Sequence, residues 1–380
     1  MTLQENNNTI KILTTGDPHF KKNNVEEMEK FTLKFTELAK KLKPDYIVNL
    51  GDTFDEHERN HTYAAEMFRR FMKSITKIAP NAIIVGNHDR IDNQDYLTKW
   101  HQLGSYKGWK DVIVADKPKG ITIKGQHFIF TPYVYPGRFI EALNTYPKDF
   151  KTARTIFAHQ EFKGANYGNG KSTIGDNWPQ DYPLIVSGHI HDFQKIQENI
   201  VYTGTPISHT YGAERRKTVS LFTFFEDGTY SHERFDLEVV KKVKKILTID
   251  QAMVWIPQDE ILYKLIVKGT TDAINVFQKT ERCKQLENFA KIMKYERDNT
   301  NIGEISTINL NINKTKKTFL EHFKTMITNK LERDLYCDIF GMDETVFVDE
   351  KINSADISNK KQKGEICANT SKKRFIRRRK

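Results

Sequence analysis

Five short apolar stretches of this chain each end in side chains that can bind a metal ion. They read KILTTGDPHF, DYIVNLGDTFD, AIIVGNHD, TIFAHQEF and LIVSGHIHD. Runs rich in Ile, Val and Leu and bounded by Gly, Pro or charged residues are typical of strands covered on both faces. The polar side chains come at the carboxyl ends of these predicted strands, the edge at which α/β sheets bind ligands. The pattern therefore predicts a layered α/β fold with one polar edge.

The side chains at these strand ends are suitable ligands for two divalent ions. They are Asp17, His19, Asp52, Asn87, His88, His159, His189 and His191. Two ions about 3.5–4 Å apart need a bridging carboxylate, and Asp52 is the candidate. Oxygen and imidazole ligands without thiolate suit Mn²⁺, Fe²⁺ or Zn²⁺ better than Ca²⁺ or Cu⁺. Glycines beside the candidates, such as Gly51 and Gly86, let the chain turn sharply around an ion.

In their order along the chain, D-x-H, GD-x-x-D, GNHD, a lone His and G-H-x-H, these motifs resemble those of the calcineurin-like metallophosphoesterases. Within that group the chain is most similar to the SbcD and meiotic-recombination-eleven nucleases, because the strand and turn YTGTP at 202–206 follow the last motif. The resemblance covers residues 16–206. It implies an α/β fold, a two-sheet sandwich flanked by helices and followed by a small α+β capping domain.

The resemblance also implies a role for each candidate residue. The implied ligands are, for one ion, Asp17, His19 and His191; for the other ion, Asn87, His159 and His189; and, as the bridge, Asp52. His88 is implied to be the catalytic acid that protonates the leaving oxygen, because an imidazole exchanges protons near neutral pH. Some relatives have a second His three positions after the bridge, where this chain has Asp55. His57 follows and is either a substitute or merely exposed.

Neighbouring residues have two interpretations each. Asp55 and Asp89 either orient a ligand imidazole or accept hydrogen bonds from loop backbone. A lone His such as His159 is more often a hydrogen-bonded structural residue, and its place between GNHD and GHIHD is what favours a ligand. Arg90 is a candidate for a phosphate contact, and His209, just after the GTP turn, is a candidate for the lining of the site.

Composition narrows the class of protein. A chain of 380 residues is longer than those that usually fold around a single hydrophobic core, so a second domain is expected. No long apolar run or signal peptide is evident, and three widely spaced Cys give neither a disulfide framework nor a zinc pattern. We therefore expect no membrane association and an intracellular, reducing compartment, either cytoplasm or nucleus. A net charge of +11 favours DNA as partner, although an AT-rich genome also produces a Lys-rich chain.

Apolar residues recur at helical spacing over 25–42 and 64–78, which predicts two amphipathic helices after the first two strands. Later runs predict further strands, interpreted as a second sheet packed on the first: HFIFTPY, IVYTGTP, VSLFTFFEDG and TYSHERFDL. The basic run 237–245 marks a boundary between a catalytic domain, 1–236, and an accessory domain, 237–345.

In the accessory domain we expect a strand at YKLIVKG, mostly helix over 271–295 and a strand at IGEISTINLNI. Apolar residues at four-residue steps predict a helix over 318–340, which is either core or a partner surface. The resembled nucleases work with an SbcC-type coiled-coil ATPase, so this helix is a candidate docking segment. A homodimer is a further option. Residues 346–380 are expected to be a disordered basic tail that contacts phosphate, directs nuclear import or is only solvated.

These observations predict an enzyme, a DNA nuclease that depends on two divalent ions and attacks a phosphodiester with metal-bound hydroxide. Mn²⁺ is the expected ion, with Fe²⁺ or Zn²⁺ as alternatives. Double-strand-break repair, recombination or replication is the expected setting, with exonuclease or endonuclease action left open. One alternative is a phosphatase or cyclic-nucleotide phosphodiesterase on the same scaffold, although GDTFDEH lacks the Arg of the protein-phosphatase motif GD-x-V-D-R-G. Another is a non-catalytic DNA-binding assembly subunit, which the complete ligand set disfavours.

Overall fold

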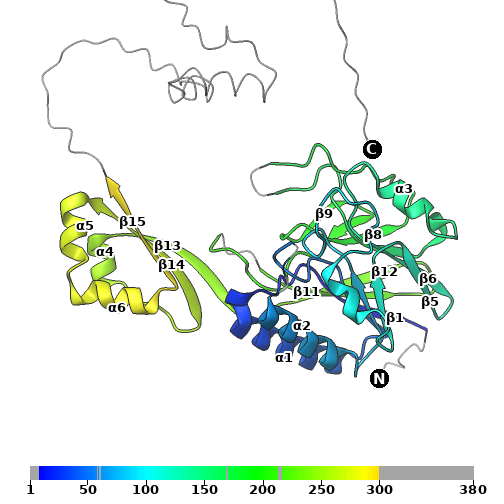
Figure 1. The fold of residues 1–380 in the computed structure, drawn as a ribbon, viewed down its shortest axis with the longest axis horizontal. Coiled ribbons are helices and arrows are strands. Elements are labelled where there is room, and N and C mark those ends of the chain that lie inside the picture. Colours follow the sequence, from blue (N-terminus) through cyan, green and yellow to red (C-terminus); the bar gives the residue numbers. More distant parts are fainter. Residues whose placement is uncertain (1–7, 58, 60, 168–169, 213–215, 299–380) are drawn as a thin grey trace, which may run out of the picture. The chain divides into compact units, whose positions relative to one another are not determined.

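The computed structural model describes residues 8–298, apart from 58, 60, 168–169 and 213–215. Its larger part consists of two six-stranded sheets with helices outside them (Figure 1). The first sheet has the order β12-β11-β1-β2-β3-β4. Its strands are β1 (Ile10–Thr15), β2 (Tyr46–Asn49), β3 (Asn81–Ile84), β4 (Val112–Ala115), β11 (Val219–Phe224) and β12 (Tyr230–Phe235). Strands β1 to β4 run parallel, whereas β11 is antiparallel to both of its neighbours.

The second sheet has the order β5-β6-β7-β8-β10-β9. Its strands are β5 (Lys119–Ile123), β6 (Gln126–Thr131), β7 (Thr155–His159), β8 (Leu184–Gly188), β9 (Gln194–Gln197) and β10 (Ile200–Tyr202). The four strands from β6 to β10 in this order run parallel, and the edge strands β5 and β9 are antiparallel. Each sheet therefore has a parallel centre whose strands end at one edge.

Alternating side chains join the sheets and helices into layers. In β2, Val48 faces the core between the two sheets, whereas its neighbour Ile47 faces the helices. In β7, Phe157 faces the same central core and Ile156 faces the outer side of the second sheet. Because successive strand residues point to opposite faces, apolar residues at every position bury both faces. This is why the central strands read as continuous apolar runs.

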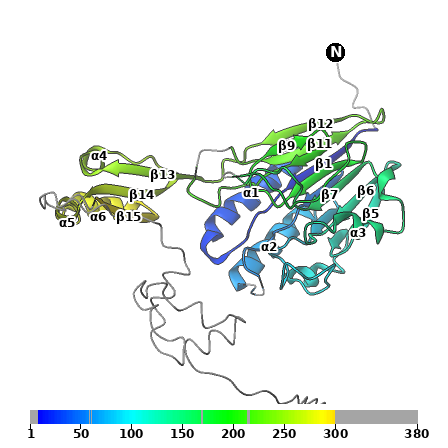
Figure 2. The same cartoon turned by 90° about the horizontal axis from the view of Figure 1, so that it is seen from above.

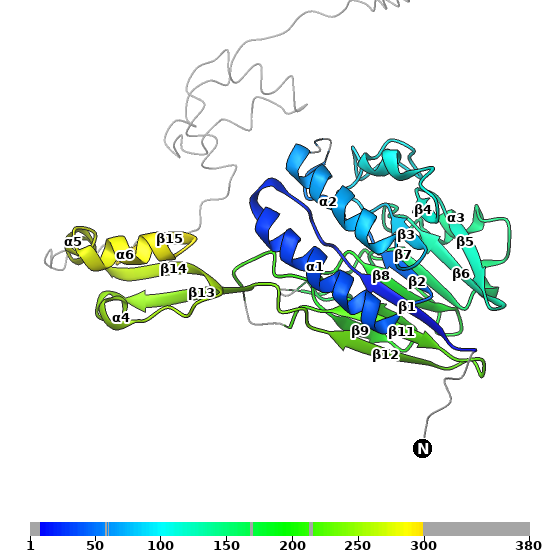
Figure 3. The same cartoon turned by 90° about the horizontal axis from the view of Figure 1, so that it is seen from below.

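Two long helices cover the outer face of the first sheet and lie side by side in Figure 3. They are α1 (Val25–Leu42) and α2 (Thr62–Ile75). Phe35 of α1 and Phe71 of α2 are fully buried, with ring centroids 5.3 Å apart. A left-handed residue, Lys43 (φ 48°), ends α1, and the His61 side chain accepts a hydrogen bond from the first turn of α2. The predicted helix 25–42 is confirmed, and the predicted 64–78 lies two to three residues too late.

A short helix and three single-turn segments complete the larger part. Helix α3 (Phe139–Asn144) lies beside β5 and β6 in Figure 2 and packs on the outer face of the second sheet. The 3-10 turns span Lys22–Asn24, Gln102–Tyr106 and Phe150–Thr152. The predicted two-sheet sandwich flanked by helices is thereby confirmed.

Residues 241–298 form a smaller sheet with a core of its own. Parallel strands β13 (Lys241–Thr248), β14 (Ile261–Thr270) and β15 (Ile292–Asp298) have the order β13-β14-β15. Helices α4 (Ile249–Val254), α5 (Thr271–Phe277) and α6 (Glu281–Phe289) accompany them. Leu265, Phe277 and Leu286 are buried together. This core is separate from the cores of the two larger sheets.

Two expectations about these elements need correction, and three others lie outside the described residues. The runs VSLFTFFEDG and TYSHERFDL, assigned to a second sheet, are β11 and β12 of the first sheet, where β11 pairs with β1. Residues 292–295, assigned to helix, belong to β15, whose Tyr295 faces the module's core while Lys294 is exposed. The strand IGEISTINLNI, the helix 318–340 and the tail 346–380 lie outside the described residues. Among the described residues, no helix has both the length and the apolar character that a membrane crossing needs.

Candidate two-metal site

The predicted ligands come together where parallel strands of both sheets end. Strands β1, β2 and β3 of the first sheet lead to Asp17 and His19, to Asp52, and to Asn87 and His88. Strands β7 and β8 of the second sheet lead to His159, and to His189 and His191. The sequence did not indicate that the ligands divide between two sheets, because each motif reports only its own strand.

The backbone at these strand ends is bent into a conformation that side chains rarely adopt. The φ angles are 39° at Asp17, 47° at His19, 47° at Asp52 and 80° at His189. A left-handed conformation at a residue other than glycine costs on the order of 1–3 kcal/mol, and these four residues lie together at the strand ends. The bends turn the side chains of successive motif residues toward one point.

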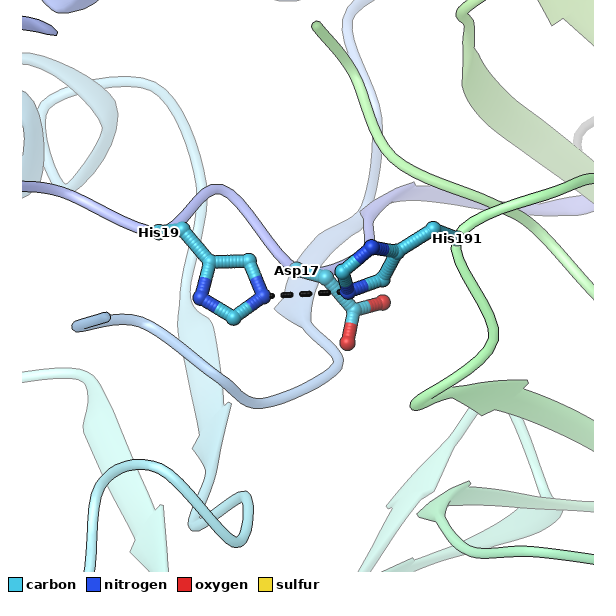
Figure 4. Close-up of side chains that lie close together, drawn as sticks. All are labelled: Asp17, His19 and His191. Atoms are coloured by element: carbon cyan, nitrogen blue, oxygen red, sulfur yellow. Dashed lines mark hydrogen bonds between the residues drawn. The ribbon is translucent and has the colours of Figure 1, made fainter. Parts of the chain in front are cut away.

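Asp17, His19 and His191 form the first group of candidate ligands (Figure 4). One potential ligand atom from each lies within 4.8 Å of the others. Nε2 of His19 and Nε2 of His191 are 3.2 Å apart. The Asp17 carboxylate accepts a hydrogen bond from the His189 amide through Oδ1 at 2.8 Å, while its buried Oδ2 has no hydrogen-bond partner among the described residues. A cation at this point would satisfy that oxygen.

Asn87, His159 and His189 form the second group. Oδ1 of Asn87 lies 2.9 Å from Nε2 of His159 and 3.0 Å from Nδ1 of His189. Nδ1 of His159 lies 2.8 Å from the carbonyl oxygen of Leu50, which can only accept, so this nitrogen donates the hydrogen bond. In the neutral ring Nε2 then presents a lone pair to the amide oxygen. The three atoms converge on one point, and a metal ion bound there would take the place of the hydrogens between them.

Asp52 lies between the two groups. Its Oδ1 is 3.3 Å from Nε2 of His159, and its Oδ2 is 3.8 Å from Nε2 of His19. Oδ1 also accepts the backbone N–H of His88 at 2.9 Å, which fixes the rotation of the carboxylate. The two oxygens therefore face different groups, as a bridge between two ions requires.

Burial governs the charges of these residues. It lowers the pKa of His19 to about 3, so this ring is in the neutral form that binds metal, and desolvation on the inner side of the exposed residue His191 lowers its pKa in the same direction. Burial raises the pKa of Asp17 to about 8, because no cation in the protein compensates its charge sufficiently. Burial alone would lower the pKa of His159, but the charge and hydrogen bond of Asp52, the charge of Asp17 and the hydrogen bond to Leu50 together outweigh it and raise that pKa to about 9. Bound divalent ions would supply the positive charge in place of this proton, so the donor set fits the metals that the motifs predict.

His88 lies beside the ligands without joining either group. Its Nδ1 is 2.7 Å from the carbonyl oxygen of Asp55, to which it donates, and its Nε2 is 4.0 Å from Oδ2 of Asp52. The ring of His57 stacks on it with centroids 4.7 Å apart and planes 23° from parallel. His57 is therefore neither a ligand nor merely exposed, because it supports one face of the candidate acid.

The structure separates the two readings of the neighbouring acidic residues. Oδ1 of Asp55 lies 3.3 Å from Nδ1 of His19, so this carboxylate faces the imidazole of a candidate ligand without a hydrogen bond between them. Asp89 instead accepts backbone hydrogen bonds from Phe54 at 3.0 Å and Gly86 at 2.9 Å, as a loop-forming residue does. Arg90 is 1% exposed and donates to the carbonyl of Tyr133 at 2.7 Å, so it is held in the core instead of reaching out to a phosphate.

Some residues of the site carried no sequence signal or a weak one. The hydroxyl of Tyr167 lies 3.1 Å from Nε2 of His189, and Oε2 of Glu161 lies 3.8 Å from the same nitrogen. His209 contacts the first group. Tyr167 and His209 lie on loops outside any motif, and the only indication was their position near the lone His or the GTP turn.

Gly51 offers a test of how tightly the second group is built. A Cβ at this position would lie 2.4 Å from Nδ1 of His159, and φ is +104°. Gly108 has a similar φ of +99° but nothing within 4 Å of its Cβ position. We expect both Gly→Ala variants to lose stability through backbone strain, on the order of 1–3 kcal/mol. Gly51→Ala alone should also displace His159 and lose bound metal. Thermal unfolding and metal content measure the two effects, and equal losses in both variants would contradict the clash.

Comparison with known proteins places the site in a family. Residues 10–222, which include all the predicted ligands, match the model for the calcineurin-like phosphoesterases. The chain is 34% identical over 317 residues to "Putative phosphoesterase 078R" of Invertebrate iridescent virus 3, covering 81% of this chain and 91% of that protein. It is 37% identical over 279 residues to "Putative phosphoesterase 244L" of Invertebrate iridescent virus 6, covering 71% and 98%. A solved archaeal phosphodiesterase aligns with 13% identity and a TM-score of 0.34, over 60% of this chain and 100% of that chain.

Proposed function

This chain belongs to the calcineurin-like phosphoesterase family and is a metal-dependent hydrolase, and we propose that it cleaves phosphodiester bonds in DNA. The observation that carries the proposal is the pairing of two ligand groups around Asp52 with an imidazole, His88, whose Nε2 faces the same carboxylate at 4.0 Å. An alkoxide leaving from a diester needs a proton, and His88 is positioned to supply one.

The proposed ligand assignment follows the two groups. Asp17, His19 and His191 would hold one ion, Asn87, His159 and His189 the other, and Asp52 would bridge them. When bound, the ion pair supplies Lewis acidity for the phosphoryl oxygens and promotes ionisation of the attacking water. Mn²⁺ is our first choice because the set mixes carboxylate, amide and imidazole ligands without thiolate.

The chain's own residues provide orientation and the proton. Asp52 fixes the spacing of the two ligand groups, since each of its oxygens faces one of them. His88 donates through Nδ1 to the Asp55 carbonyl, which leaves Nε2 as the nitrogen that delivers a proton to the leaving oxygen. The stacked ring of His57 keeps His88 from rotating out of line. Positioning of this kind, together with general acid catalysis, accounts for a large share of the rate of phosphoryl transfer.

Charge at the rim of the first group supports a polyanionic substrate. Lys21 is held 3.0 Å from Oδ1 of Asp55, and Lys217 donates to the carbonyl of His191 at 2.9 Å. Both lysines remain partly exposed beside the ligands. Arg90, the guanidinium that the sequence offered for a phosphate contact, is buried, so it provides no bidentate contact to the terminal oxygens of a phosphate monoester. The net charge of +11 agrees with a nucleic acid.

We further propose a role in double-strand-break repair, recombination or replication, together with an SbcC-type ATPase. The support is the resemblance of the motifs alone, because the candidate docking helix 318–340 lies outside the described residues. A domain boundary near residue 237 is likewise a proposal, supported by the separate core of the β13–β15 sheet.

The proposal is tested by comparing substrates under one condition. Purified full-length protein with Mn²⁺ is assayed on duplex DNA, single-stranded DNA, bis(para-nitrophenyl) phosphate, para-nitrophenyl phosphate and a cyclic nucleotide. We expect hydrolysis of DNA and the nitrophenyl diester, little hydrolysis of the monoester, loss of activity with EDTA and recovery with added Mn²⁺. Faster hydrolysis of the monoester would indicate a phosphatase, and hydrolysis of the cyclic nucleotide without DNA cleavage would indicate a cyclic-nucleotide phosphodiesterase.

A further inference from the structure

His209 lies in the loop that follows β10, and its side chain contacts the first ligand group. Its ring centroid is 4.8 Å from that of His19, with planes at 82°, and 5.3 Å from that of His191, with planes at 63°. Its Nε2 is 2.8 Å from the backbone carbonyl oxygen of Asp17. One side chain therefore contacts every member of the first group.

The hydrogen bond fixes which nitrogen of His209 carries the proton. A backbone carbonyl only accepts, so Nε2 is protonated and donates to Asp17. Because Nε2 already donates this hydrogen, it is not available as a metal ligand. The ring of His209 makes T-shaped contacts with the rings of His19 and His191, and its Nε2 presents no lone pair to an ion between them.

The first group needs an external support of this kind. Asp17 and His19 both have left-handed backbone, with φ of 39° and 47°, and a hydrogen bond to the carbonyl between these bends resists their relaxation. His191 is the most exposed ligand of the group, so packing on the inner side of its ring decides where Nε2 points. In the second group, the carbonyl of Leu50 and the hydroxyl of Tyr167 contact the ligand rings instead.

We propose that His209 is a positioning residue for the ion held by Asp17, His19 and His191. It holds the Asp17 backbone through its N–H and keeps the Nε2 atoms of the two ligand rings 3.2 Å apart and aimed at one point. The inference rests on the proposed metal assignment and is independent of whether DNA is the substrate. It predicts that a change at residue 209 affects one ion much more than the other.

The test uses three variants that separate the hydrogen bond from the packing. His209→Phe keeps a ring and loses the donor, His209→Gln keeps a donor and loses the ring, and His209→Ala loses both. His232→Phe is the control, since that His is also partly buried and stacks on Phe222 at 4.2 Å, away from the ligands. Metal-free protein is titrated with Mn²⁺ by calorimetry, and bound ions are counted by mass spectrometry.

We expect His209→Ala to weaken one of two Mn²⁺ sites by about 10–100-fold, the usual range for residues that orient ligands. The second site should be unchanged, and His209→Phe and His209→Gln should lie between His209→Ala and the parent. Equal weakening of both sites, or a loss equalled by His232→Phe, would overturn the positioning role and leave the metal assignment standing. A parent protein that binds no Mn²⁺ would overturn both. If His209→Ala does not fold, Phe and Gln variants with parental affinity for both ions would refute the proposal.

Discussion

Asp52→Asn is expected to lower hydrolysis of bis(para-nitrophenyl) phosphate by about three orders of magnitude or more, because metal-ion stabilisation of the transition state is worth several kcal/mol. The substitution keeps the shape of the side chain and an oxygen for the His88 amide. It removes the negative charge that faces His159 at 3.3 Å and His19 at 3.8 Å. A neutral amide presents only one acceptor oxygen, so it cannot bridge two dications as a carboxylate does.

Metal content distinguishes this explanation from a folding defect. Purified Asp52→Asn should unfold cooperatively and retain fewer than two ions by mass spectrometry. Asp45→Asn is the control, since the Asp45 carboxylate also accepts a backbone hydrogen bond, from Lys11 at 2.8 Å, but lies outside both ligand groups. The control should keep its metal and activity. Two ions retained in Asp52→Asn with full activity would refute the bridging role.

The fold features that the sequence predicted are those with a local signal. Strands β1, β2, β3, β7 and β8 are rich in apolar residues because both of their faces are buried, and the two long helices have a single apolar face. The partners of a strand have no such signal. Ile10 pairs with Phe224 across more than two hundred residues, and nothing in either segment indicates that β11 joins the first sheet. The same limit explains why residues 292–295, next to a helix in sequence, were assigned to the wrong element.

In the candidate site, too, the features with a local sequence signal were predictable and the others were not. The convergence of candidate ligands at strand ends was predictable because each motif places a metal-binding side chain directly after a strand, and the structure brings these side chains together. The contacts that surround these candidate ligands could not be predicted from the sequence. Tyr167, Glu161 and His209 act on His189, His19 or His191 from loops whose path depends on tertiary packing. Asp55 and Asp89 occupy similar sequence positions after a candidate ligand, yet only the structure shows that Asp55 faces an imidazole and that Asp89 accepts backbone hydrogen bonds.

His88→Asn is expected to reduce cleavage of DNA by about 10²–10⁴-fold, the range attributed to a general acid. Asn retains an N–H that can donate to the Asp55 carbonyl, so the loop after β3 should keep its course. The variant should also keep its metal, because His88 belongs to neither ligand group. Turnover and bound ions are measured on the same preparation. A loss of metal in parallel with activity would indicate that His88 is a ligand.

Substrates with different leaving groups show whether His88→Asn has lost the ability to donate a proton. A deoxyribose alkoxide is a strong base and needs protonation as it departs, whereas para-nitrophenolate is stable without it. His88→Asn should therefore lose no more than about tenfold on bis(para-nitrophenyl) phosphate if it acts as the acid, and equal losses on both substrates would contradict that role. His57→Phe is the matched variant, since it keeps a ring to stack on His88 but has no exchangeable proton. Near-parental rates in His57→Phe would show that His57 acts by packing and leave His88 as the acid.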